Sequence, residues 1–77
     1  MNRVKSEHHD FSTAYESLPG NKIMEVRQDL MRRLDWSMSV FYYKKRGDTP
    51  IWEHEEQIIE EIFRTYNLNP WTGSPIN

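Results

Sequence analysis

Apolar residues recur along the first part of this chain at intervals of three and four positions, the spacing of one face of an α-helix. The first apolar stripe consists of Phe11, Ala14, Tyr15 and Leu18. Asp10 precedes the stripe as a candidate cap, and Pro19-Gly20 follows it as a break. We therefore predict a short helix over residues 10–18.

A second amphipathic helix is predicted over residues 21–34. Its apolar stripe consists of Ile23, Val26, Leu30 and Leu34. Asn21 is a residue type that commonly caps helices, and it stands directly before this stripe.

The third segment, residues 36–43, can be interpreted in two ways. Alternate positions carry large apolar side chains, which is typical of a strand. A helix is favoured by Ser37 as a cap, by Trp36 placed to pack on Phe41 as a hydrophobic staple, and by Gly47 as a helix end. Because no second strand is apparent to pair with the first, we predict a helix over residues 38–46.

The last helix is predicted over residues 50–66, with Thr49 as its cap and Pro50 in its first turn. Residues 1–9 and 68–77 are polar or rich in proline and are expected to be a disordered terminus and a flexible tail, flanking a helical domain at 10–67. Trp71 is the large apolar residue of the tail, and we expect it either to fold back on the core or to contact a partner.

The expected fold class is therefore all-α, a small domain of three to four helices. The predicted core consists of Phe11, Tyr15, Ile23, Val26, Leu30, Leu34, Trp36, Phe41, Trp52, Ile59, Ile62 and Phe63. The chain has no cysteine and no apolar run long enough for a membrane span, so we expect a cytoplasmic protein without a membrane partner.

Charge divides the sequence unevenly. Residues 22–47 carry seven basic and three acidic residues, a net charge of +4, whereas residues 48–77 carry one basic and six acidic residues, a net charge of −5. This division indicates one basic face and one acidic face, or alternatively the ordinary solvated surfaces of helices. A basic face would suit nucleic acid.

The segment 28–47 resembles the helix-turn-helix of the lambda repressor and Cro-like family. Leu30 and Leu34 match the apolar positions of the first motif helix, and residues 35–37 match the turn. Phe41 matches the buried position of the recognition helix, and Gly47 matches the glycine that closes it. The Leu-Pro-Gly break at 18–20, the Glu-Val-Arg run at 25–27, and the Trp-Ser and Phe-Tyr pairs at 36–37 and 41–42 also resemble small helix-turn-helix-like proteins of Bacteroidota and their mobile elements.

Three positions depart from the repressor pattern. Met31 replaces a small residue at the contact between the two motif helices, and Asp35 replaces the usual glycine of the turn. Lys44 stands where the pattern has a second apolar residue.

The resemblance implies a DNA-binding transcriptional regulator whose recognition helix is about 38–46. The residues expected to contact bases are Met38, Ser39, Tyr42 and Tyr43. The residues expected to contact phosphates are Arg32, Arg33, Lys44, Lys45 and Arg46. The expected partner is duplex DNA, bound by a homodimer or together with a second protein.

Other chemistry is not indicated by the sequence. No nucleophile–base pair or phosphate-binding loop is present, so an enzyme and a cofactor are not expected. His8-His9 and the isolated His54 do not predict a metal site, and the glutamates between residues 53 and 61 are interpreted as a surface charge run. The alternative function is a helical protein-interaction module, an adaptor or anti-repressor that uses the acidic last helix or the Trp71 tail.

Overall fold

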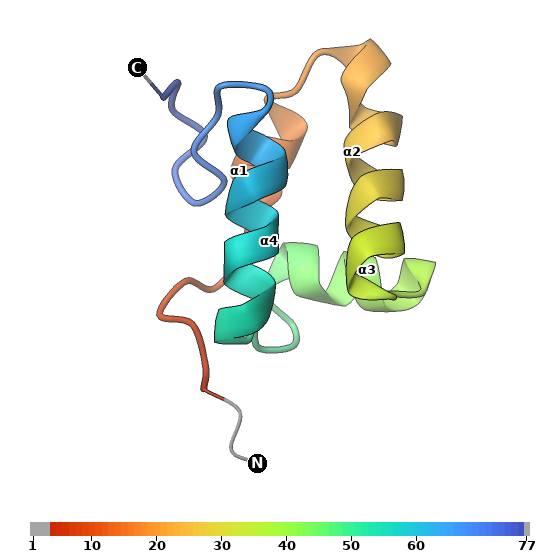
Figure 1. Cartoon of the computed structure of the whole chain (residues 1–77), viewed down its shortest axis with the longest axis vertical. Helices are drawn as coiled ribbons and strands as arrows, with labels where there is room; N and C mark the ends of the chain where they lie inside the picture. Colours follow the sequence, from red (N-terminus) through yellow and green to blue (C-terminus); the bar gives the residue numbers. More distant parts are fainter. Residues whose placement is uncertain (1–3, 77) are drawn as a thin grey trace.

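The computed structural model describes residues 4–76, and residues 1–3 and 77 of the expected loose ends lie outside the described residues. The described part contains four helices: α1 (Ser12–Glu16), α2 (Gly20–Leu34), α3 (Met38–Arg46) and α4 (Glu53–Arg64). In Figure 1, α2 and α4 run antiparallel, and α3 lies across one end of the pair. The predicted all-α fold is confirmed, and none of these helices is both long and apolar enough to traverse a lipid bilayer.

Aromatic rings fill the space between the helices. Phe11, which directly precedes α1, is completely buried, and its ring centroid lies 6.0 Å from those of Phe41 and Phe63 and 6.4 Å from that of Trp36. Phe11 therefore joins α3, α4 and the α2–α3 turn in one cluster. Edge-to-face and offset aromatic contacts of this kind stabilise a core beyond the area that they bury.

Most of the predicted core is confirmed, with a few differences. Ile23, Leu34 and Trp52 are only partly buried, whereas Ala14, Leu18 and Ile51 belong to the core in addition. The buried hydrophobic residues are Phe11, Ala14, Tyr15, Leu18, Val26, Leu30, Trp36, Phe41, Ile51, Ile59, Ile62 and Phe63.

The first two helices do not begin as predicted. α1 spans residues 12–16 rather than 10–18, and the Asp10 carboxylate accepts a bond of 3.4 Å from the Ser12 hydroxyl instead of capping the backbone. α2 begins at Gly20 after Pro19, so that Asn21 lies inside the helix and is not its cap. Neither helix has a side-chain cap at its N-terminus.

α3 spans residues 38–46, as predicted. The Ser37 hydroxyl accepts a 3.2 Å hydrogen bond from the amide of Val40, and Gly47 ends the helix with φ +85°. These two residues satisfy first-turn and last-turn backbone groups that would otherwise lack partners. Residues 38–43 are therefore helical, and the strand interpretation is wrong.

The predicted start of α4 is wrong by three residues. Trp52 is extended, with φ −89° and ψ +156°, and residues 51–53 pair with the N-terminal segment: the amide of Ser6 donates to the carbonyl of Ile51, and the amide of Glu53 donates to the carbonyl of Val4, both at 2.7 Å. The helix begins at Glu53, the last residue of this pairing, so Trp52 takes the cap position in place of Thr49.

The tail after α4 also makes ordered contacts. Leu68 and Pro75 form an isolated antiparallel bridge, and the Asn69 side chain accepts hydrogen bonds from the amides of Trp71 and Thr72 at 2.8 and 3.2 Å. Figure 1 shows this segment folded along one side of α4. The structure confirms the first of the two alternatives for Trp71, in which this residue folds back.

Candidate functional site

The connection between α2 and α3 is a turn of three residues. Asp35 adopts the left-handed conformation, with φ +55° and ψ +43°, and the amides of both Asp35 and Trp36 donate to the carbonyl of Met31. Ser37 then caps the next helix. A left-handed residue at the end of a helix reverses the chain in few residues, and α3 consequently begins at once across the end of α2.

A buried polar network fixes the inner side of α3. The Lys44 ammonium donates to Glu55 Oε1 at 2.8 Å and to the carbonyl of Pro50 at 2.6 Å. Glu55 Oε1 also accepts from the amide of Trp52 at 3.0 Å, and Oε2 accepts from the Trp36 indole at 3.1 Å. The two charged side chains are each only 8% exposed. Burial of the pair is tolerable because both charges have several hydrogen-bond partners.

This network corrects two expectations. Lys44 was expected to contact a DNA phosphate, but its ammonium is enclosed and already bound, so it cannot reach a ligand outside. Glu55 was expected to belong to a surface charge run, but it lies inside and bonds back to the amide at the start of α4, as in a capping box. The burial of Lys44 has one signal in the sequence, because this residue stands at a position where the helix pattern has an apolar residue.

The outer side of α3 is exposed over the whole length of the helix. Met38 and Tyr43 are 49% and 46% exposed, and Ser39 and Arg46 are exposed between them. The Arg46 guanidinium lies 5.5 Å from the centroid of the Tyr43 ring. We call these four residues, Met38, Ser39, Tyr43 and Arg46, the outer face of α3.

Tyr42 lies at the edge of this face and is partly buried. Its hydroxyl accepts a 3.4 Å hydrogen bond from Arg27 of α2, and its ring packs at an angle on that of Phe41. Of the four residues expected to contact bases, Tyr42 is therefore the least accessible.

The remaining basic residues have intramolecular partners. Arg32 pairs with Asp29 at 2.9 Å, Arg33 with Glu61 of α4 at 3.0 Å, and Arg46 with Asp48 at 2.8 Å. The Lys45 ammonium lies 5.3 and 5.1 Å from the ring centroids of Tyr15 and Tyr42. Exposed ion pairs are weak, on the order of 0–1 kcal/mol, so a phosphate could replace these carboxylates at low cost.

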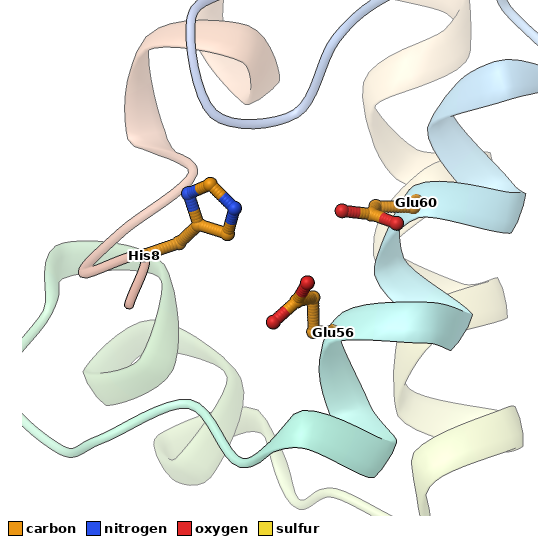
Figure 2. A group of neighbouring side chains, drawn as sticks. All are labelled: His8, Glu56 and Glu60. Atoms are coloured by element: carbon orange, nitrogen blue, oxygen red, sulfur yellow. The ribbon is translucent and has the colours of Figure 1, made fainter. Parts of the chain in front are cut away.

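A second group of polar residues lies on the side of α4 that faces the N-terminal segment. His8 from the N-terminal segment faces Glu56 and Glu60, which are one helical turn apart (Figure 2). One potential ligand atom from each residue lies within 4.8 Å of the other two, and all three residues are partly buried. The sequence did not predict this group, because His8 and α4 become neighbours only through the pairing of residues 4–6 with residues 51–53.

Trp71 completes this second group. Its ring is parallel to that of His8, with 4.3 Å between the centroids and 1° between the planes, and its indole N–H donates to Glu60 Oε2 at 2.9 Å. The tail thus holds both a histidine ring and a carboxylate in defined orientations.

Comparisons of this chain with protein-family profiles, with curated proteins and with solved structures found no significant match.

Proposed function

We propose that the protein binds duplex DNA weakly through the outer face of α3, as a helix-turn-helix regulator. The observation that carries this proposal is the free face of a rigidly held helix at one end of the molecule (Figure 1). Phe41 and Lys44 anchor the inner side of α3, so a ligand on the outer face meets a preorganised surface. A left-handed turn followed at once by a capped helix also agrees with the helix-turn-helix resemblance.

The chemistry of the face suits the edges of base pairs in the major groove. The Ser39 hydroxyl can donate or accept a hydrogen bond, and Met38 can contact a thymine methyl group. Both residues lie in the first turn of α3, the part of a recognition helix that usually reaches bases. Tyr43 and Arg46 extend the contact toward the backbone, where the guanidinium can bind phosphate.

The electrostatic support is modest. Without Lys44, the basic residues available for phosphate are Arg32, Arg33, Lys45 and Arg46, and three of them carry carboxylate partners. Few phosphate contacts mean low affinity and a limited salt dependence. Useful sequence specificity would then require a dimer on paired half-sites or a second DNA-binding protein.

Fluorescence anisotropy of labelled duplexes over a salt series tests the proposal. Arg46→Ala should weaken binding to all sequences and reduce the slope of log affinity against log salt by about 0.9. Arg64→Ala is the matched control, since Arg64 is exposed at the end of α4 that points away from α3, and it should leave the slope unchanged. Ser39→Ala should change the preference among sequences. Absence of binding to any duplex at low salt and high micromolar protein would reject DNA binding.

A protein interface on the same face is the second candidate. Met38 and Tyr43 are large, exposed and adjacent to an arginine, and Met, Tyr and Arg are enriched at protein interfaces. The tail is less suited to this role than the sequence indicated, because Trp71 is already stacked on His8 and bonded to Glu60. If no duplex is bound and Met38→Glu converts an oligomer to a monomer in sedimentation, the interface takes the place of the DNA site.

A further inference from the structure

We propose that His8, Glu56 and Glu60 together bind one divalent transition-metal cation, and that Zn²⁺ fits the site best. The three side chains offer one imidazole nitrogen and two carboxylate oxygens. Nitrogen and oxygen donors of this kind bind first-row divalent metals, and three protein ligands with an open fourth position for water form a familiar zinc arrangement. This proposal is independent of the proposed DNA binding.

The arrangement leaves room for an ion between the ligands. Because the three ligand atoms lie within 4.8 Å of one another, a point exists that is no farther than about 2.8 Å from each, compared with roughly 2.0–2.2 Å in zinc sites. Shifts of well under an ångström in partly buried side chains would close the difference. Glu56 and Glu60 can make them together, because residues four apart lie on the same side of a helix (Figure 2).

Trp71 supplies the outer support that metal ligands generally have. Its indole N–H occupies Glu60 Oε2, which orients the carboxylate and leaves Oε1 available, and its stacked ring fixes the plane of the His8 imidazole. Hydrogen bonds and packing of this kind around metal ligands contribute substantially to affinity. An ordinary exposed acidic surface lacks such support.

The charge of the group also favours a cation. Within residues 4–76, the Glu56 carboxylate and the ring nitrogens of His8 have no hydrogen-bond or ion-pair partner. Two neighbouring carboxylates repel each other, and a divalent ion between them would remove this repulsion while using the free imidazole lone pair. Such an ion would join the N-terminal segment to α4, with the tail held through Trp71.

Isothermal titration of the full-length, tag-free protein with Zn²⁺ tests the proposal, with Co²⁺ absorption as a second readout of the ligand geometry. We expect one equivalent of metal, a rise in melting temperature on binding, and a tetrahedral Co²⁺ spectrum. His8→Ala, Glu56→Gln and Glu60→Gln should each lower the affinity by at least about tenfold, and Trp71→Phe, which keeps a stacked ring but loses the N–H, should lower it by a smaller factor.

His9→Ala and His54→Ala are the matched controls, because both histidines are exposed and neither belongs to the group. They should leave stoichiometry and affinity unchanged. Equal losses in His8→Ala and His9→Ala, non-saturable binding, or no binding at about millimolar Zn²⁺, the weak end of metal affinities in proteins, would overturn the proposal. Should His8→Ala fail to fold by circular dichroism, Glu56→Gln decides the question, because it replaces a carboxylate that bonds to no other residue between 4 and 76.

Discussion

Lys44 and Glu55 bring opposite charges into the interior, but their remaining partners differ. Without Lys44, the Glu55 carboxylate would still accept hydrogen bonds from the Trp36 indole and the Trp52 amide. Without Glu55, these two donors would lose their acceptor, and the Lys44 ammonium would keep one hydrogen bond, to the carbonyl of Pro50, and its positions over the rings of Trp36 and Trp52. The two substitutions should therefore have unequal effects.

We expect Glu55→Ala to lower the free energy of unfolding by about 3–5 kcal/mol, the usual cost of removing one member of a buried ion pair. Lys44→Met, which retains the volume of the chain, should cost clearly less. Urea denaturation measures both, with Glu53→Ala as the exposed control. A larger loss for Lys44→Met than for Glu55→Ala would show that the network is assigned incorrectly.

Asp35 adopts a backbone conformation that glycine adopts more easily. At φ +55° its Cβ is strained, and its negative charge lies at the C-terminal end of the α2 dipole. Asp35→Gly should therefore raise the free energy of unfolding by about 0.5–1 kcal/mol, although glycine also gains entropy in the unfolded chain. Thermal melts should rank Asp35→Gly above Asp35→Ala; the reverse order would contradict the left-handed turn.

Tyr15 links stability to alkaline pH. Burial raises the pKa of its phenol above the usual 10.0, the nearby Arg27 lowers it, and Tyr42 raises it. The hydroxyl donates a 3.2 Å hydrogen bond to the carbonyl of Ile23. Because the folded state keeps this proton to higher pH than the unfolded state does, the contribution of Tyr15 is complete below pH 10 and is lost as pH rises through the folded-state pKa.

Tyr15→Phe should thus cost about 1 kcal/mol at neutral pH through loss of the hydrogen bond. The difference from the wild-type protein should shrink above pH 10, since phenylalanine does not ionise. Urea titrations across the alkaline range measure this, with the exposed Tyr43→Phe as the control. Parallel stability curves for Tyr15→Phe and the wild type would contradict the account.

At the scale of elements, α3 could be predicted from the sequence and the start of α4 could not. Ser37 and Gly47 specify the two ends of α3, and each does so through hydrogen bonds to residues only three or four positions away in the sequence. The start of α4 depends on the pairing of Ile51 and Glu53 with the N-terminal segment, which no local pattern reveals. Local chemistry determines a helix end only where no distant segment competes for the same backbone groups.

The helix caps provide a direct comparison. Ser37→Ala should lower the free energy of unfolding by about 1 kcal/mol, because the Val40 amide loses its acceptor. Thr49→Val should be neutral or stabilising, because the Thr49 hydroxyl oxygen is buried without a hydrogen-bond partner among residues 4–76 and caps no helix. If denaturant midpoints show the larger loss for Thr49→Val, the assignment of the start of α4 is wrong.

For the whole molecule, ion pairs join the basic and the acidic segments of the sequence. Arg33, Lys44 and Arg46 of the basic segment pair with Glu61, Glu55 and Asp48 of the acidic segment, so part of the opposite charge is neutralised between them. Positions on α3 could be assigned to its inner or outer side from the helical pattern, apart from the buried Lys44 and the partly buried Tyr42. The His8 group could not be predicted, because it requires three parts of the chain that meet only in the fold.

The central claim is that duplex DNA binds to the outer face of α3. An NMR titration of the ¹⁵N-labelled protein with a duplex tests this claim most directly. We predict that amide shifts concentrate at Met38, Ser39, Tyr43 and Arg46, while those around His8 and Trp71 remain unchanged. Shifts confined to the His8 side of α4, or no shifts at low salt and excess duplex, would contradict the assignment of α3 as the DNA-binding helix.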